Sequence, residues 1–246
     1  MRTCVFLGPT LSIDEARGIL RADIHPPVAL GDVLRAIDAG FTTLVLIDGF
    51  FHGQPAVWHK EIMYGLSRGC AVVGCSSMGA LRAAELAAYG MQGHGEIFAQ
   101  FYNGQLDGDD EVAVAHSDHE SGYRCLSEPL VNIRHGIDLA VRTGMLSAHA
   151  ARGLLAASKA TFYADRHWER VLRAAAEQGL PVDDVAALRE FIAANDLDLK
   201  RKDAVQTLRW VARGGHESGP VDAEPFTFEE TYSWRLLRMT EGTSGP

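Results

Sequence analysis

Three short apolar runs in the first third of the chain most constrain its fold. They are TCVFLG at 3–8, TTLVLIDG at 42–49 and CAVVGC at 70–75, each rich in β-branched residues and each ending at a glycine or another small residue. Continuous rather than alternating apolarity is typical of strands that are buried on both faces of a parallel sheet. The runs therefore predict inner strands of such a sheet.

Segments with helical patterns separate these runs. They span 13–20, 31–39 and 55–68, and Pro55 is predicted to occupy the first turn of the last one. A further strand is expected at 111–116, EVAVAH. Strands that alternate with helices form right-handed βαβ units. The predicted fold class is α/β, with an open, mostly parallel, Rossmann-like sheet.

The pattern changes to successive helices after residue 126. Ser127 and Ser147 are predicted N-caps, and Asp165, Asp183 and Asp198 lie near later helix starts. We therefore expect an α/β core at 1–126 and a helical extension, or cap, packed on it at 127–213. Residues 214–246 are expected to form a linker and a short C-terminal segment, because GGHESGPVDAEP is rich in Gly, Pro and acidic residues.

The composition excludes several classes of function. The 246 residues include 32 Asp and Glu against 23 Lys and Arg, and the resulting charge of −9 opposes general binding to nucleic acid or to an anionic membrane. We find neither a secretory signal nor an apolar run long enough to cross a bilayer. The four cysteines show no CxxC spacing. We expect a cytoplasmic protein with reduced thiols.

Polar residues follow each predicted strand. Ligands of open α/β sheets bind outside the carboxyl ends of the strands, so these residues are candidates for a common site. They are Gly8, Pro9 and Thr10 after the first run, Asp48 and Gly49 after the second, Ser76 and Ser77 after the third, and His116 and Asp118 after the fourth.

Ser77 is the strongest candidate among them. The stretch Cys75-Ser76-Ser77-Met78-Gly79 has the spacing of a nucleophile elbow, in which small neighbours permit a strained turn. The Met78 N–H would then help to form an oxyanion hole. Alternatively, Ser76 or Ser77 only caps the following helix, which is the commoner role of a serine there. The sequence leaves open which of the two serines faces outward.

Two groups could supply a base for such a serine. His59, Lys60 and Glu61 lie near the strand end that Asp48 marks, but a helix lets at most two of them face one site, and a solvated face is the alternative. His116 follows Ser77 and an acidic run, which matches the order serine, acid, histidine of α/β hydrolases.

Anion binding and cofactors can be considered in the same way. Arg82 and Glu85, three residues apart, could pair with each other or hold an anion near the helix N-terminus. A zinc site at His116, Asp118 and His119 has weak support, and the chain contains neither GxGxxG nor GxxxxGK[ST]. We expect no metal and no cofactor.

Six stretches taken in order resemble the blocks of the TfuA-like protein family. They are VFLGPTL, LIDGFF, PAVWHKEI, SSMGALRAAEL, DDEVAVAH and LSEPLVNIR. The resemblance covers about residues 3 to 140 and continues more faintly to 212, whereas the tail beyond Gly214 resembles no family.

The resemblance implies a partner of a YcaO-type enzyme, which forms backbone thioamides in ribosomally made peptides (RiPP biosynthesis) or in a methanogenic enzyme. A TfuA-like partner would act as a hydrolase in sulfur transfer, releasing sulfide from a thiocarboxylated ubiquitin-like sulfur carrier, or would activate YcaO by contact. A thiocarboxylate anion is a poor electrophile, so attack by Ser77 needs cationic groups such as His59, Lys60 or Arg82.

Two alternatives to the hydrolase come from other classes. A non-catalytic adaptor would dock on YcaO, with YSWRLLRM near the C-terminus as one candidate docking segment. A generic serine esterase is disfavoured because no HGGG-type loop accompanies the elbow. A homo-oligomer is compatible with the sequence.

Overall fold

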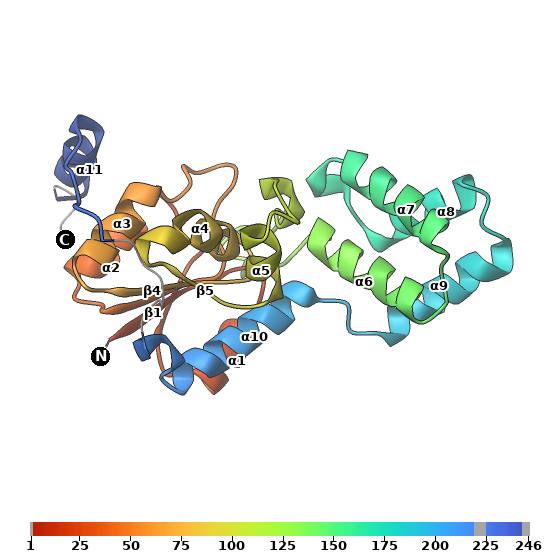
Figure 1. Cartoon of the computed structure of the whole chain (residues 1–246), viewed down its shortest axis with the longest axis horizontal. Coiled ribbons are helices and arrows are strands. Elements are labelled where there is room, and N and C mark those ends of the chain that lie inside the picture. The colour runs from red at the N-terminus through yellow and green to blue at the C-terminus, as the bar shows by residue number, and fades with distance from the viewer. Residues whose placement is uncertain (1, 219–224, 243–246) are drawn as a thin grey trace. The chain divides into compact units, whose positions relative to one another are not determined.

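The computed structural model describes residues 2–218 and 225–242, which Figure 1 shows in colour. They divide into two compact units. The first contains the described residues of 1–107 and 201–246, and the second is Gly108–Lys200. The division predicted from the sequence, with boundaries after residues 126 and 213, stays a prediction. Within the described part of the chain, no helix is long and apolar enough to cross a membrane.

The first unit is built on a five-stranded parallel sheet. Its strands are β1 (Thr3–Phe6), β2 (Asp23–His25), β3 (Thr43–Leu46), β4 (Ala71–Gly74) and β5 (Gln92–Gly93). Their order is β2-β1-β3-β4-β5, and every neighbouring pair is parallel. The predicted open parallel sheet is confirmed. The three apolar runs form β1, β3 and β4, the inner strands.

Alternate residues of the inner strands point to opposite faces of the sheet, and helices cover both. Cys4 and Phe6 of β1 belong to one core cluster, whereas Val5 belongs to the other. The first face is covered by α2 (Asp32–Asp38), α3 (His59–Ser67) and α4 (Met78–Leu86), and the second by α1 (Ile13–Ile19) and α10 (Leu199–Ala212) (Figure 1). The helix α10 contacts the sheet through Ala204 and Leu208.

The remaining elements of this unit lie around the sheet. They are η1 (Ala87–Tyr89), α5 (Glu96–Tyr102), η4 (Gly215–Ser218) and α11 (Tyr232–Gly242). In α11, Trp234 and Leu237 pack on Leu34 of α2, which anchors the C-terminal segment to the unit. Residues 219–224 of the predicted linker lie outside the described residues.

The second unit is helical, as predicted for this half of the chain. It contains η2 (Asp109–Glu111), α6 (Leu130–Arg142), α7 (Ala148–Ala160), η3 (Tyr163–Asp165), α8 (Trp168–Glu177) and α9 (Val182–Ala194). Its core joins Leu130, Leu154, Val171 and Leu188 from the four α-helices. The predicted N-cap Ser147 is confirmed, because its Oγ accepts from the Ala150 N–H at 3.2 Å.

The strand expected at 111–116 is wrong. Asp109–Glu111 is a 3₁₀ turn, and the buried residues Val112 and Ala113 continue as irregular chain. The Lys200 ammonium donates to the Val112 carbonyl at 3.0 Å, so a side chain and not a strand satisfies this backbone group. The buried apolar residues of EVAVAH therefore belong to a loop. The apolar pattern of the sequence does not distinguish such a loop from a buried strand.

Two predicted helix starts are also wrong. Helix α3 begins at His59 and not at Pro55, because the Pro55 carbonyl accepts from the Leu30 N–H at 2.9 Å and Ala56 forms a β-bridge with Ala29. Ser127 does not cap α6. Its Oγ accepts from the Ala115 N–H at 2.8 Å, and Pro129 is the residue before that helix.

Candidate functional site

The strand order reverses between β1 and β3, and the structure brings predicted site residues together there. Asp48, only 2% exposed, follows β3. Its Oδ2 accepts from the N–H groups of Gly8 and Thr10 at 2.9 and 3.0 Å, and its Oδ1 accepts from the Thr10 hydroxyl at 2.6 Å. Pro9 lies within this loop. The carboxylate thus fixes the loop after β1 at the place where doubly wound sheets bind ligands.

The next strand, β4, ends in a sharp turn at Ser76. The φ angle of Ser76 is +64°, which is uncommon for a residue other than glycine, and its side chain is fully buried. The Ser77 N–H donates to the Cys75 carbonyl at 2.7 Å, which closes a three-residue turn. Backbone conformations of this kind store about 1–3 kcal/mol and concentrate at functional sites.

Two glycines let helix α4 start directly against the sheet. A Cβ on Gly79 would collide with the Leu46 carbonyl of β3, and a Cβ on Gly74 would collide with the Gly79 carbonyl. The Gly79 N–H donates to the Ile47 carbonyl at 3.2 Å. The start of α4 is therefore held beside the end of β3, where Asp48 follows.

Ser77 occupies the N-cap position of α4 but does not cap it. Its φ and ψ are −122° and −124°, and its hydroxyl makes no capping hydrogen bond. Within the described part of the chain, no oxygen accepts from the N–H of Met78, the first residue of α4. Met78 itself is buried against Gly49. A hydroxyl that caps nothing and an adjacent amide donor are the groups that an elbow needs.

A cluster of charged side chains joins α3 to α4. The Nε2 of His59 and the Nη1 of Arg82 lie 2.8 and 2.6 Å from the same oxygen of Glu85. The Nε of Arg82 donates to the Val57 carbonyl at 3.3 Å. Burial raises the pKa of Glu85, but the hydrogen bonds from His59 and Arg82 outweigh it and hold this pKa below its usual value. The pairing of Arg82 with Glu85, one of the two predicted arrangements, is confirmed.

The neighbours of His59 point to other partners. The Lys60 ammonium lies 4.5 Å above the ring of Phe228. Glu61 is fully buried, and its carboxylate accepts from the N–H groups of Gly31 and Trp58 at 2.8 and 3.2 Å. Burial raises the pKa of Glu61. The structure therefore separates three residues that are consecutive in the sequence, and it favours a structural role for Glu61.

His116 belongs to the second unit. Its Nδ1 donates to the Ser117 carbonyl at 2.8 Å, and the residue forms an antiparallel bridge with Cys125. Its predicted role as a base for Ser77 stays a prediction. Among residues 2–218 and 225–242, no group of three or more His, Cys, Asp or Glu could hold a metal ion.

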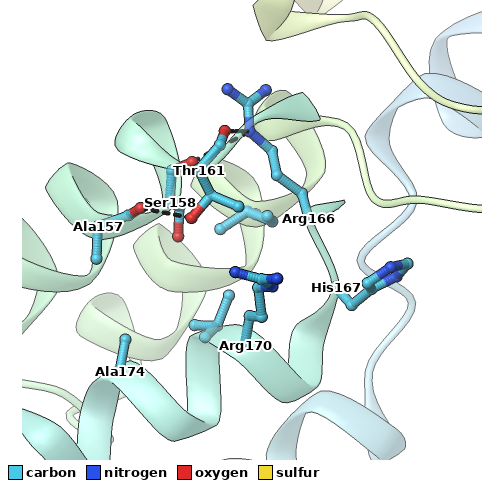
Figure 2. A pocket seen from close by; sticks show the side chains of 9 residues that line it. Ala157, Ser158, Thr161, Arg166, His167, Arg170 and Ala174 are labelled. Atoms are coloured by element: carbon cyan, nitrogen blue, oxygen red, sulfur yellow. Dashed lines mark hydrogen bonds between the residues drawn. The ribbon is translucent and has the colours of Figure 1, made fainter. Parts of the chain in front are cut away.

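The second unit also contains a hollow of about 250 Å³ between α7 and α8 (Figure 2). Three of the polar residues on its wall, Ser158, Thr161 and Arg166, are hydrogen-bonded within the protein. The hydroxyls of Ser158 and Thr161 donate to helix carbonyls at 2.8 and 2.9 Å, and the Arg166 Nε donates to the Ser158 and Thr161 carbonyls at 3.1 and 3.0 Å. We therefore treat Arg166 as a structural residue of this unit.

Two polar residues of α10, Asp203 and Thr207, bond to elements at the edge of the sheet, and this was not predicted from the sequence. Asp203 of α10 accepts from the N–H groups of Glu96 and Ile97 at 3.0 and 2.8 Å, so it caps α5. Thr207, one turn later, hydrogen-bonds Cys75, and burial raises the pKa of that thiol well above its usual range. The available signal was the spacing of Asp203 and Thr207, which places both on the helix face that packs on the sheet.

One family model matches the chain. The model described as TfuA-like protein covers residues 48–167, from the carboxylate that follows β3 to the residue before α8. The match includes the turn at Ser76 and Ser77, the charged cluster of α3 and α4, and the loop of His116. No curated protein matches the chain.

Proposed function

Because residues 48–167 place this chain in the TfuA-like family, we propose that it releases sulfide from a thiocarboxylated sulfur carrier through a serine nucleophile. The family is associated with thioamide formation in partnership with YcaO enzymes. The proposal adds a chemical step for this chain. The observation that carries it is the Ser77 hydroxyl, which caps nothing and follows the strained turn at Ser76.

The step begins with attack on the carrier. The Ser77 oxygen bonds to the carbonyl carbon of the C-terminal thiocarboxylate, its proton passes to a base, and the negative charge develops on oxygen near the Met78 N–H. The C–S bond then breaks, the sulfur takes the proton from the base, and hydrosulfide leaves. Water hydrolyses the ester that remains, which regenerates Ser77 and gives a carrier carboxylate.

We assign the base to His59. Glu85 accepts from its Nε2 at 2.8 Å, so in the neutral ring the lone pair is on Nδ1. Arg82, whose side chain is 13% exposed, supplies fixed positive charge to the same cluster. The Glu85 carboxylate, 2.6 Å away, offsets part of this charge, and the remainder favours an anionic substrate at the start of α4. The alternatives from the sequence are Lys60, which lies over an aromatic ring, and His116.

The experiment measures sulfide that the purified full chain releases from a ubiquitin-like protein carrying a chemically installed C-terminal thiocarboxylate. We expect release by the wild type and a loss of at least 100-fold in Ser77→Ala. Ser12→Ala is the matched control, because Ser12 caps α1 and lies outside the site. Release that persists in Ser77→Ala but is lost in Ser76→Ala would transfer the role to Ser76, and release unaffected by both would refute the serine mechanism.

An adaptor that activates YcaO by contact is the second candidate, and helix α11 favours it. Trp234 and Leu237 are buried, whereas Tyr232, Leu236 and Met239 are 73%, 45% and 67% exposed. These three residues have the spacing i, i+4 and i+7 of a helix that lies in a groove. If free sulfide replaces the carrier, an adaptor still raises YcaO turnover, and Leu236→Asp abolishes this effect. A hydrolase that acts only by supplying sulfide shows no effect in this assay.

A further inference from the structure

A cysteine and a histidine face each other on a short β-ribbon of the second unit. His116 and Cys125 form an antiparallel bridge. The Leu126 N–H donates to the Ala115 carbonyl at 2.8 Å, and the Ser117 N–H donates to the Arg124 carbonyl at 2.9 Å. His116 and Cys125 are therefore a pair without hydrogen bonds between their own backbones. Side chains of such pairs share one face, with Cβ atoms about 4.5–5.5 Å apart.

The hydrogen bond of His116 assigns its tautomer. Its Nδ1 lies 2.8 Å from the Ser117 carbonyl, and a carbonyl can only accept. The Nδ1 therefore carries the proton, and in the neutral ring the lone pair is on Nε2. Tyr123 packs edge-on against the ring at 5.6 Å, which limits its rotation. The imidazole is thus positioned to act as a base through Nε2.

Cys125 differs from the other three cysteines in exposure. Cys4 and Cys75 are buried and Cys70 is half-buried, and burial raises the pKa of each. Cys125 is exposed, and its thiol donates to the Ser127 carbonyl at 3.0 Å. An exposed thiol beside an imidazole is the environment of a reactive cysteine, whereas buried cysteines are inert.

The surrounding backbone favours attack on sulfur over attack on an acyl carbon. The N–H groups on either side of Cys125 are already donated, that of Leu126 to the Ala115 carbonyl and that of Arg124 to the Ser117 hydroxyl at 2.8 Å. These two groups cannot stabilise the oxyanion of an acyl transfer. Displacement at a sulfur atom requires only a thiolate with access to its target.

From this arrangement we propose that Cys125 and His116 form a second site, which accepts sulfane sulfur from a persulfide. The thiol rotates from the Ser127 carbonyl toward His116, Nε2 removes its proton, and the Cys125 thiolate attacks the terminal sulfur of the donor R–S–SH. The S–S bond of the donor breaks as the new one forms. The products are Cys125–S–SH and a donor thiolate, which takes the proton from His116. The exchange needs no oxidant or reductant, and it does not rest on the hydrolysis proposed above.

The test exposes the full-length protein to glutathione persulfide and measures the mass of the peptide that contains Cys125. We expect one additional sulfur on that peptide and at least tenfold less on the peptide with Cys70. His116→Asn keeps a donor for the Ser117 carbonyl but removes the base, so it should slow the uptake at least tenfold. His119→Asn is the matched control, because His119 also packs edge-on against Tyr123 but has no bridge to Cys125, so this variant should leave the rate unchanged.

A second measurement tests the reactivity of the Cys125 thiol without the persulfide donor. Alkylation of Cys125 by iodoacetamide at pH 7 should also slow at least tenfold in His116→Asn. Uptake and alkylation that are equal in wild type and His116→Asn, or uptake no greater at Cys125 than at Cys70, would overturn the proposal. Because the readout is the mass at Cys125, this result is distinct from the sulfide release that tests Ser77.

Discussion

In the first unit, the buried carboxylate of Asp203 accepts from the uncharged N–H groups of Glu96 and Ile97. In the second unit, by contrast, cations hold the acidic side chains of the 3₁₀ turn η2. There, Arg134 binds Glu111 through two hydrogen bonds of 2.8 Å. The Lys159 ammonium lies 2.6 and 3.0 Å from Asp110 and Glu111. The acidic side chains of the two units therefore have different partners: neutral N–H groups in the first unit and cations in the second.

The two arrangements have opposite effects on acidity. Burial raises the pKa of Asp203 to about 6, and the two N–H groups offset this only partly. Burial also raises the pKa of Asp110, but hydrogen bonds and charge from Lys159 and Arg166 hold it below its usual value. Partners that carry a full charge thus decide whether a carboxyl group stabilises its unit at neutral pH.

The largest effect is expected for Arg166→Met. Arg166 is 2% exposed, and it donates to Asp110 at the carboxylate (2.7 Å) and at the carbonyl (2.5 Å). Lys159 still pairs with the Asp110 carboxylate in this variant, but the carbonyls of Asp110, Ser158 and Thr161 lose the Arg166 donor, and each buried acceptor left unsatisfied costs about 1–3 kcal/mol. Hydrogen exchange in peptides of α6 and α7 should accelerate at least 100-fold.

Arg170→Met is the control for this variant. Arg170 of α8 is exposed and lines the same hollow as Arg166 (Figure 2). Surface substitutions of this kind change stability by less than about 0.5 kcal/mol. If both variants exchange at the rate of the wild type, cations do not hold η2 in the way we describe.

An intermediate effect on the free energy of unfolding is expected for Asp203→Asn, and this effect depends on pH. The pKa of Asp203 is about 6 in the folded state against 3.8 for an ordinary Asp. The folded chain therefore binds more protons than the unfolded chain between these values, and its stability falls as pH rises through this window. The asparagine keeps a capping oxygen but does not titrate. Relative to wild type it should gain up to about 3 kcal/mol between pH 4 and pH 7.

Hydrogen exchange in peptides of α5 at pH 4, 5.5 and 7 measures this gain. Asp110→Asn provides the comparison, because the pKa of Asp110 is lowered. Its contribution to stability is present at neutral pH and is lost as the pH falls through its folded-state pKa. Asp110→Asn, followed by hydrogen exchange in peptides of α6 at pH 3, 5 and 7, should therefore destabilise most at pH 7 and least at pH 3. Equal pH slopes for the two variants would remove the distinction between the units.

The sheet was largely predictable because its inner strands are continuous apolar runs, and the edge strands were not. The edge strands β2 and β5 span only Asp23–His25 and Gln92–Gly93 and contain few apolar residues. They exist because the backbone of β1 and β4 offers hydrogen bonds to a neighbour. Conversely, EVAVAH contains apolar residues but is not a strand, because its backbone bonds side chains such as Lys200.

The candidate site was predictable where it depends on local sequence. The turn at Ser76 and Ser77 follows from small residues between a strand and a helix, but its strained residue is Ser76, one position before the serine on which the predicted elbow was centred. The contact of His59 with Glu85 was not predictable. It joins two helices 26 residues apart, and it depends on how α3 and α4 are rotated on the sheet.

The smallest effect on stability is expected for Glu85→Gln, and this makes it the sharpest probe of the site. The Glu85 side chain is 37% exposed, and ion pairs of this exposure contribute at most about 1 kcal/mol. Because its pKa is lowered, that contribution is present at neutral pH and disappears as the pH falls through the folded-state value. In contrast, sulfide release should fall about tenfold or more, because the glutamine keeps an acceptor oxygen for His59 but lacks the negative charge that stabilises the imidazolium formed when His59 takes the Ser77 proton. Thermal melts at pH 7 and pH 4, beside release assays at pH 7, separate the two effects.

A variant that melts like the wild type and releases sulfide at the wild-type rate would exclude His59 and Glu85 from the chemistry and leave Lys60 or His116 as the base.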